Sequence, residues 1–74
     1  MNSYKLIIDN SKYWTNCTLT KNGSIIQTNF RYYTVDENII CIFEEVGGQD
    51  SRAKGELIAK YCITDCEFSK QEIR

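Results

Sequence analysis

The sequence predicts a small all-β domain built from five antiparallel strands. Apolar and polar residues alternate over residues 3–9, 13–20 and 25–35, which is the period of strands that bury one face. The pair Asn22-Gly23 separates the second and third of these segments, and Asn-Gly favours a type I′ hairpin turn. No segment with a helical period precedes Arg52. These observations favour an antiparallel meander over a mixed fold.

The first two strands each present one apolar face to the expected core. Over residues 3–9 this face carries Tyr4, Leu6 and Ile8, and Asn10-Ser11 ends the strand. Over residues 13–20 the threonine content favours a strand over a helix. The core face of this second strand is expected to carry Tyr13, Thr15, Cys17 and Leu19, and the outer face Trp14, Asn16, Thr18 and Thr20.

The third strand, over residues 25–35, is long for a single strand, so a kink is expected near Thr28-Asn29. Strict alternation predicts that its core face carries Ile26, Thr28, Phe30 and Tyr32. The outer face would then carry Ile25, Gln27, Asn29, Arg31, Tyr33 and Val35.

A central strand is predicted over residues 39–43, because this segment is apolar on both faces. Residues 36–38 supply the turn before it. Residues 46–51 are expected to form a flexible loop with Gly47-Gly48 as its hinge.

Residues 52–68 fit a strand or a helix, and the strand is favoured. Gly55 and the β-branched pair Ile63-Thr64 count against a helix, whereas the alanines, lysines and Leu57 count for one. The alternative is an α+β fold, with a helix near 52–62 packed on a four-stranded antiparallel sheet.

Five short strands in 74 residues predict a meander rolled into a small barrel of the SH3-like or OB-like kind. A chain of this length holds one core, so residues 1–68 are expected to form a single domain. Residues 69–74 are polar and are expected to form a C-terminal tail.

The formal net charge of -1 hides two halves of opposite sign. Residues 1–35 carry four Lys or Arg against one Asp, which gives +3, and residues 36–74 carry five against nine acids, which gives -4. Near-neutrality of the whole excludes a polycationic nucleic-acid binder and a polyanionic mimic of DNA.

The cysteines are expected to be free thiols. The N-terminal residues lead only into the short apolar run Leu6-Ile7-Ile8, so we expect no signal peptide, no membrane segment and a cytoplasmic location. Thiols stay reduced there, and two disulfides are the alternative. Only one pair of the four has metal-ligand spacing, so no metal and no cofactor is expected. The four are Cys17, Cys41, Cys62 and Cys66.

Catalysis is not expected from this set of residues. The chain has no histidine, which removes the commonest general base, and no recognised spacing pairs a Ser or Cys with a Lys or carboxylate. The neighbours Glu44 and Glu45 point to opposite faces of a strand, so at most one could join a shared site. We therefore expect a protein that is not an enzyme.

Binding is the better hypothesis, because six of the nine aromatic residues lie in the positively charged half. Trp, Tyr and Arg dominate interaction hot spots because each combines a large contact area with a polar tip. The candidate contact is an aromatic and cationic outer surface, and an acidic set provides a second, electrostatic contact. The first set is Trp14, Arg31, Tyr33, Lys12 and Lys21, and the second is Asp36, Glu37, Glu44 and Glu45.

The partner is expected to be a larger protein. A domain of this size without catalytic residues suits an inhibitor or adaptor carried by a phage or another mobile element, and association with further copies of the chain stays open. The alternative is single-stranded nucleic acid, because β-surfaces that bind it also combine aromatic platforms with Lys and Arg.

Overall fold

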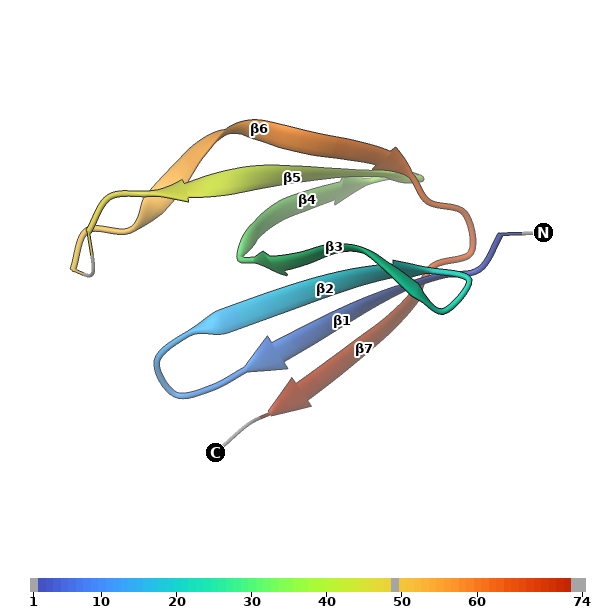
Figure 1. Cartoon of the computed structure of the whole chain (residues 1–74), viewed down its shortest axis with the longest axis horizontal. Coiled ribbons are helices and arrows are strands. Elements are labelled where there is room, and N and C mark those ends of the chain that lie inside the picture. The colour runs from blue at the N-terminus through green and yellow to red at the C-terminus, as the bar shows by residue number, and fades with distance from the viewer. Residues whose placement is uncertain (1, 49, 73–74) are drawn as a thin grey trace.

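The structure, a computed structural model, describes residues 2–48 and 50–72. Within this part of the chain the backbone forms seven strands and no helix (Figure 1). No helix long and apolar enough to cross a membrane occurs among these residues. In chain order the strands are β1 (Tyr4–Asn10), β2 (Thr15–Lys21), β3 (Ser24–Phe30), β4 (Tyr32–Asp36), β5 (Ile39–Val46), β6 (Ala53–Cys62) and β7 (Glu67–Glu72).

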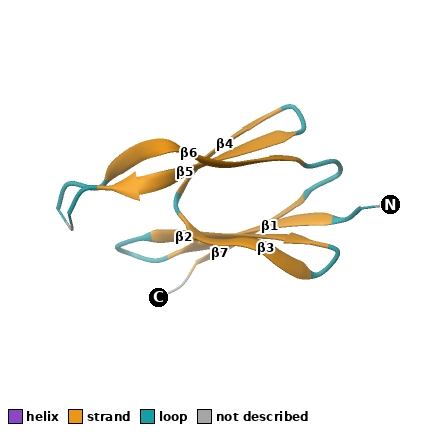
Figure 2. Cartoon of the chain, turned by 45° about the horizontal axis from the view of Figure 1, so that its top comes forward, coloured by secondary structure: helices purple, strands orange, loops and turns teal. Residues whose placement is uncertain are grey.

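The strands form two sheets that face each other (Figure 2). The four-stranded sheet has the order β3-β2-β1-β7, and the three-stranded sheet has the order β4-β5-β6. Neighbouring strands are antiparallel except β1 and β7, which run parallel with Leu6 beside Phe68. The all-β prediction is confirmed, but the predicted five-stranded barrel is wrong, because the described strands form two separate sheets and close no barrel.

The two sheets arise where the predicted third strand divides. Asn29 has a φ of 58°, and Arg31 lies outside both β3 and β4. The irregular backbone between Phe30 and Tyr32 redirects the chain from one sheet to the other. A kink was expected near Thr28-Asn29, and the observed break places the two halves of the segment in different sheets.

Residues 53–62 form a strand, so the alternative with a helix near 52–62 is wrong. Tyr61 and Ala59 lie opposite Ile40 and Ile42 of β5, and both pack against the core. Gly55 also has a place in the strand, because a Cβ on this residue would collide with the side chain of Glu44. Tertiary pairing therefore outweighs the helix formers of this segment.

The C-terminal residues 69–72 belong to β7 and pair with β1. The composition predicted a polar tail here, but the backbone hydrogen bonds of a parallel ladder do not require apolar side chains. Residues 73 and 74 of the predicted tail lie outside the described residues, as does Gln49 of the predicted loop over residues 46–51. The flexibility of that loop stays a prediction.

The core lies between the sheets and draws on both. The Asn22-Gly23 hairpin is confirmed, with φ values of 54° and 84°, and it sets Leu19 on the inner face of the four-stranded sheet. Burial of these apolar side chains is the main force that holds the sheets together. The buried residues are Tyr4, Leu6, Cys17, Leu19, Phe30, Ile40, Ile42 and Ile63.

Candidate binding surfaces

Two aromatic side chains project from the turn between β1 and β2. Tyr13 is 77% exposed and Trp14 is 42% exposed, and both are large hydrophobic residues. The Nζ atom of Lys12 lies 5.4 Å from the centroid of the Tyr13 ring, within range of a cation–π contact. We call the set Lys12, Tyr13 and Trp14 the aromatic turn.

Ser11 orders the backbone of the aromatic turn. Its hydroxyl oxygen accepts hydrogen bonds from the backbone N–H of Tyr13 at 3.3 Å and of Trp14 at 3.1 Å. Its own N–H donates to the carbonyl of Trp14 at 2.8 Å. At the base of the turn the Thr15 hydroxyl donates to the side chain of Asn10 at 2.7 Å. A short serine can close a turn this way, and the aromatic side chains are thereby left outside the core.

The structure places the five residues of the predicted aromatic and cationic surface apart. Lys12 and Trp14 lie together in the aromatic turn. Lys21 lies at the opposite end of β2, with its Nζ atom 5.8 Å from the centroid of the Tyr4 ring. Lys21 lies seven positions after Trp14 along β2, which is roughly 23 Å at about 3.3 Å per residue. Lys21 therefore cannot share a small contact with the aromatic turn.

Tyr33 lies on the inner face of the three-stranded sheet and not on the predicted outer face. It sits opposite Ile42, packs against the core and meets Phe30 edge to face, with ring centroids 6.1 Å apart. Burial raises the pKa of its phenol. The face assignment is wrong because the break at Arg31 shifts the alternation, so that Phe30 and Tyr33 both face inward.

Arg31 is half-buried and paired with an acid of the predicted second set. Its Nε lies 3.2 Å from Glu45 Oε2, and Arg52 Nε lies 3.2 Å from the other oxygen of the same carboxylate. Glu45 therefore ties the β3–β4 junction to the β5–β6 hairpin. This pairing reduces the positive charge that Arg31 offers to a partner.

The four acidic residues of the second predicted set divide between the two ends of β5. Glu44 and Glu45 lie at its C-terminal end, where Glu44 accepts a hydrogen bond from the backbone N–H of Glu56 at 3.3 Å. Asp36 and Glu37 are exposed and lie at the turn before β5. The structure therefore offers no single acidic contact made by all four residues.

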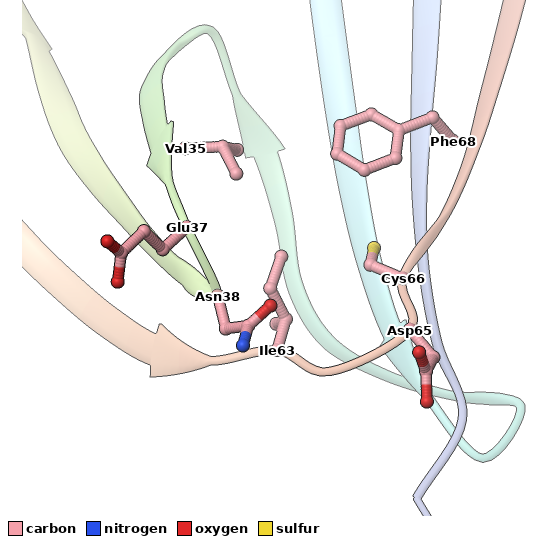
Figure 3. A pocket seen from close by; sticks show the side chains of 7 residues that line it. All are labelled: Val35, Glu37, Asn38, Ile63, Asp65, Cys66 and Phe68. Atoms are coloured by element: carbon pink, nitrogen blue, oxygen red, sulfur yellow. The ribbon is translucent and has the colours of Figure 1, made fainter.

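A hollow of about 300 Å³ lies between the end of β4 and the start of β7. Val35 and Phe68 point toward each other across it, whereas the carboxylates of Glu37 and Asp65 point away from it (Figure 3). Phe68 is 54% exposed and Val35 is 39% exposed, although both lie on the inner faces of their sheets. We call this the edge hollow, and its lining residues are Val35, Glu37, Asn38, Ile63, Asp65, Cys66 and Phe68.

The sequence pattern missed Tyr13 and Phe68 as surface residues. Alternation assigned Tyr13 to the core face of the second strand, but β2 begins only at Thr15. The signal that could have moved Tyr13 outward is Ser11, a turn-forming residue two positions before it. Phe68 lay at the boundary of the predicted tail, where local sequence carried no sign of the parallel pairing with β1.

Two of the four thiols, Cys17 and Cys66, have little nucleophilic character. Burial, with a contribution from Asp9, raises the pKa of Cys17 to about 11, and burial raises the pKa of Cys66. A thiol with a raised pKa is protonated near neutral pH and reacts slowly. Cys41 is half-buried and Cys62 is exposed, and all four cysteines are free. Among the described residues no three potential metal ligands cluster.

No known family model, curated protein or solved structure matches this chain. Its function is therefore inferred from its own residues.

Proposed function

We propose that this chain is a protein-binding module without enzymatic activity, and that the aromatic turn is its principal contact. The observation that carries the proposal is the exposure of the consecutive residues Tyr13 and Trp14 on a turn that Ser11 orders. Aromatic side chains on an ordered backbone lose little conformational freedom on binding, which favours affinity. A larger protein with a matching pocket is the expected partner, as for an inhibitor or adaptor carried by a mobile element.

The distribution of charge favours a protein over single-stranded nucleic acid. Of the three predicted cations, only Lys12 offers its charge at the aromatic turn. Arg31 is paired with Glu45, and Lys21 lies at the far end of β2. Nucleic-acid affinity depends on the number of phosphates that a surface neutralises. A turn with one lysine and two exposed aromatic residues suits a protein hot spot better than a strand of phosphates.

The absence of catalysis is supported by the chemistry of the side chains. The sequence contains no histidine, and the buried thiol of Cys17 has a raised pKa. One thiol, Cys66, lines the edge hollow, and burial also raises its pKa. A thiol with a raised pKa is not an activated nucleophile, and the commonest general base, histidine, is missing from the sequence.

The test compares partner capture by the full chain and by two variants. The double variant Tyr13→Ser, Trp14→Ser removes both aromatic rings, and Ile25→Ser is the matched control, because Ile25 is 64% exposed on β3. We expect proteins captured from a native lysate by the unmodified chain and by Ile25→Ser to be lost with the double variant. The melting temperature of the double variant should change by only a few degrees, since exposed residues contribute little to stability.

Two outcomes would contradict the proposal. Equal capture by all three chains would show that the aromatic turn is not the contact. Capture that disappears after nuclease treatment, and falls steeply between low and physiological salt, would favour the nucleic-acid alternative.

A further inference from the structure

The edge hollow lies on the side of the molecule where β4 and β7 end their sheets. On the β3–β6 side the Tyr61 hydroxyl donates to the carbonyl of Ile26 at 3.4 Å and joins the two sheets. On the other side lie β4 and β7; like β3 and β6 they are terminal strands, and within the described residues each of the four pairs on one edge only. The edge hollow lies between β4 and β7 (Figure 3).

Phe68 is exposed because, among residues 2–48 and 50–72, no strand lies beside β7 on its free edge. It sits next to Leu6, which is fully buried, and faces the same way. Leu6 has a neighbouring strand on each side, β2 and β7, whereas Phe68 has only β1 beside it. A further strand beside β7 would pair the free backbone groups and cover Phe68 at the same time.

The charges around the edge hollow favour a basic occupant. Glu37 and Asp65 line it, and Asp36 and Glu67 are close to them in the chain; all four are exposed. None of the four forms an ion pair within the part of the chain that the structure describes, since both ion pairs found there belong to Glu45. Complementary charge raises the association rate and excludes acidic partners.

A second copy of this chain is a poor occupant of the β7 edge. If two β7 strands paired antiparallel over all six residues, Glu67 of each would lie opposite Glu72 of the other. Like charges directly opposite each other destabilise a strand pair. These acids protect the edge against self-association, as charged side chains on edge strands commonly do.

The register of β7 determines which side chains an added strand would contact. Phe68 and Lys70 face inward, toward the other sheet, and Glu67, Ser69 and Gln71 face outward. Beyond the contact at the aromatic turn, we infer that the free edge of β7 binds an extended basic segment of a partner protein as an added strand. An apolar side chain of that segment fills the edge hollow beside Phe68, and a Lys or Arg on its opposite face lies beside Glu67.

A random peptide library displayed on phage tests this inference with the full chain as bait. Peptides that also bind Phe68→Ser are removed, which discards any ligand of the aromatic turn. We expect the remaining peptides to carry apolar residues alternating with Lys or Arg. The selection makes each of these peptides depend on Phe68, and Ile25→Ser, on the opposite edge of the same sheet, should leave their binding unchanged.

A charge reversal distinguishes the predicted register from general attraction. On the variant Glu67→Lys, a selected peptide should lose affinity about tenfold, and the same peptide with Glu at one alternate basic position should regain it. Hydrogen exchange of the β7 backbone amides should slow when the peptide binds, because a strand pair protects them.

The inference is overturned if no peptide is enriched over the Phe68→Ser bait, or if the enriched peptides are acidic or lack alternation. Binding without slower exchange in β7 also overturns it, because contact with side chains alone would leave the strand edge free. Each of these outcomes is independent of lysate capture through the aromatic turn, so failure of one proposal does not imply failure of the other.

Discussion

Phe30 and Tyr33 meet edge to face across the break between the two sheets, with ring centroids 6.1 Å apart and ring planes at 85°. Phe30 is the last residue of β3 and Tyr33 is the second residue of β4. The irregular backbone between them turns both rings into the core. The contact therefore joins the sheets at the point where the chain passes from one to the other.

Truncation of Tyr33 is expected to destabilise the fold. Tyr33→Ala removes a packed ring and its contact with Phe30, which should lower the free energy of unfolding by about 2–4 kcal/mol. Tyr33→Phe keeps the ring and should change it by less than about 1 kcal/mol. Urea denaturation followed by far-UV circular dichroism measures both. If Tyr33→Ala unfolds like the unmodified chain but loses its partner, Tyr33 belongs to the binding surface that the sequence predicted.

Glu45 is expected to contribute modestly to stability, because its ion pairs are partly exposed. Glu45→Gln weakens both ion pairs, and we expect a loss of about 0.5–1 kcal/mol in the free energy of unfolding. A double-mutant cycle with Arg31→Ala isolates the energy of that pair, and the coupling should shrink in 0.5 M salt, since surface charges are screened. A coupling energy that is unaffected by salt would show that the pair is shielded from solvent.

The sequence predicted individual strands better than it predicted their partners. The alternation around Leu6, the Asn22-Gly23 turn and the apolar segment around Ile42 are local signals, and each is found in the structure. The parallel pairing of Leu6 with Phe68 joins residues far apart in the chain, and no local period encodes it.

The candidate surfaces were predicted only in part, and a single backbone irregularity accounts for one major error. Alternation is valid only while the strand continues, so the break at Arg31 moved Tyr33 from the outer face to the core. Trp14 and Lys12 remain together because they lie in one turn. The exposure of Tyr13 and Phe68 was not predicted. For Tyr13 it depends on where β2 starts, and for Phe68 on the unpaired edge of β7.

A glycine at position 37 is expected to stabilise the protein. Glu37 has a φ of 55°, a left-handed conformation that costs a residue with a Cβ roughly 1 kcal/mol. Glu37→Gly removes this cost, but the greater freedom of glycine in the unfolded chain offsets part of the gain. We therefore expect the free energy of unfolding to rise by about 0.5 kcal/mol. Thermal and urea unfolding measure the change. The control Lys60→Gly, at a paired position within β6, should instead destabilise the protein; a loss of stability at both positions would refute the assigned strain.

Cys17 makes stability depend on alkaline pH. Its thiol is buried, and its pKa is raised from 9.0 to about 11, so the folded protein retains a proton that the unfolded chain releases. The stability associated with the protonated Cys17 thiol is complete below pH 9 and is lost as the pH rises toward 11. The free energy of unfolding falls by about 2 kcal/mol over this range. Urea unfolding at pH 8 and pH 10.5 measures the loss. Cys17→Ala is less stable at both pH values because it leaves a cavity, but its decline between them should be smaller. An equal decline in the two proteins would assign the pH dependence to Cys66 and Tyr33, whose pKa values burial also raises.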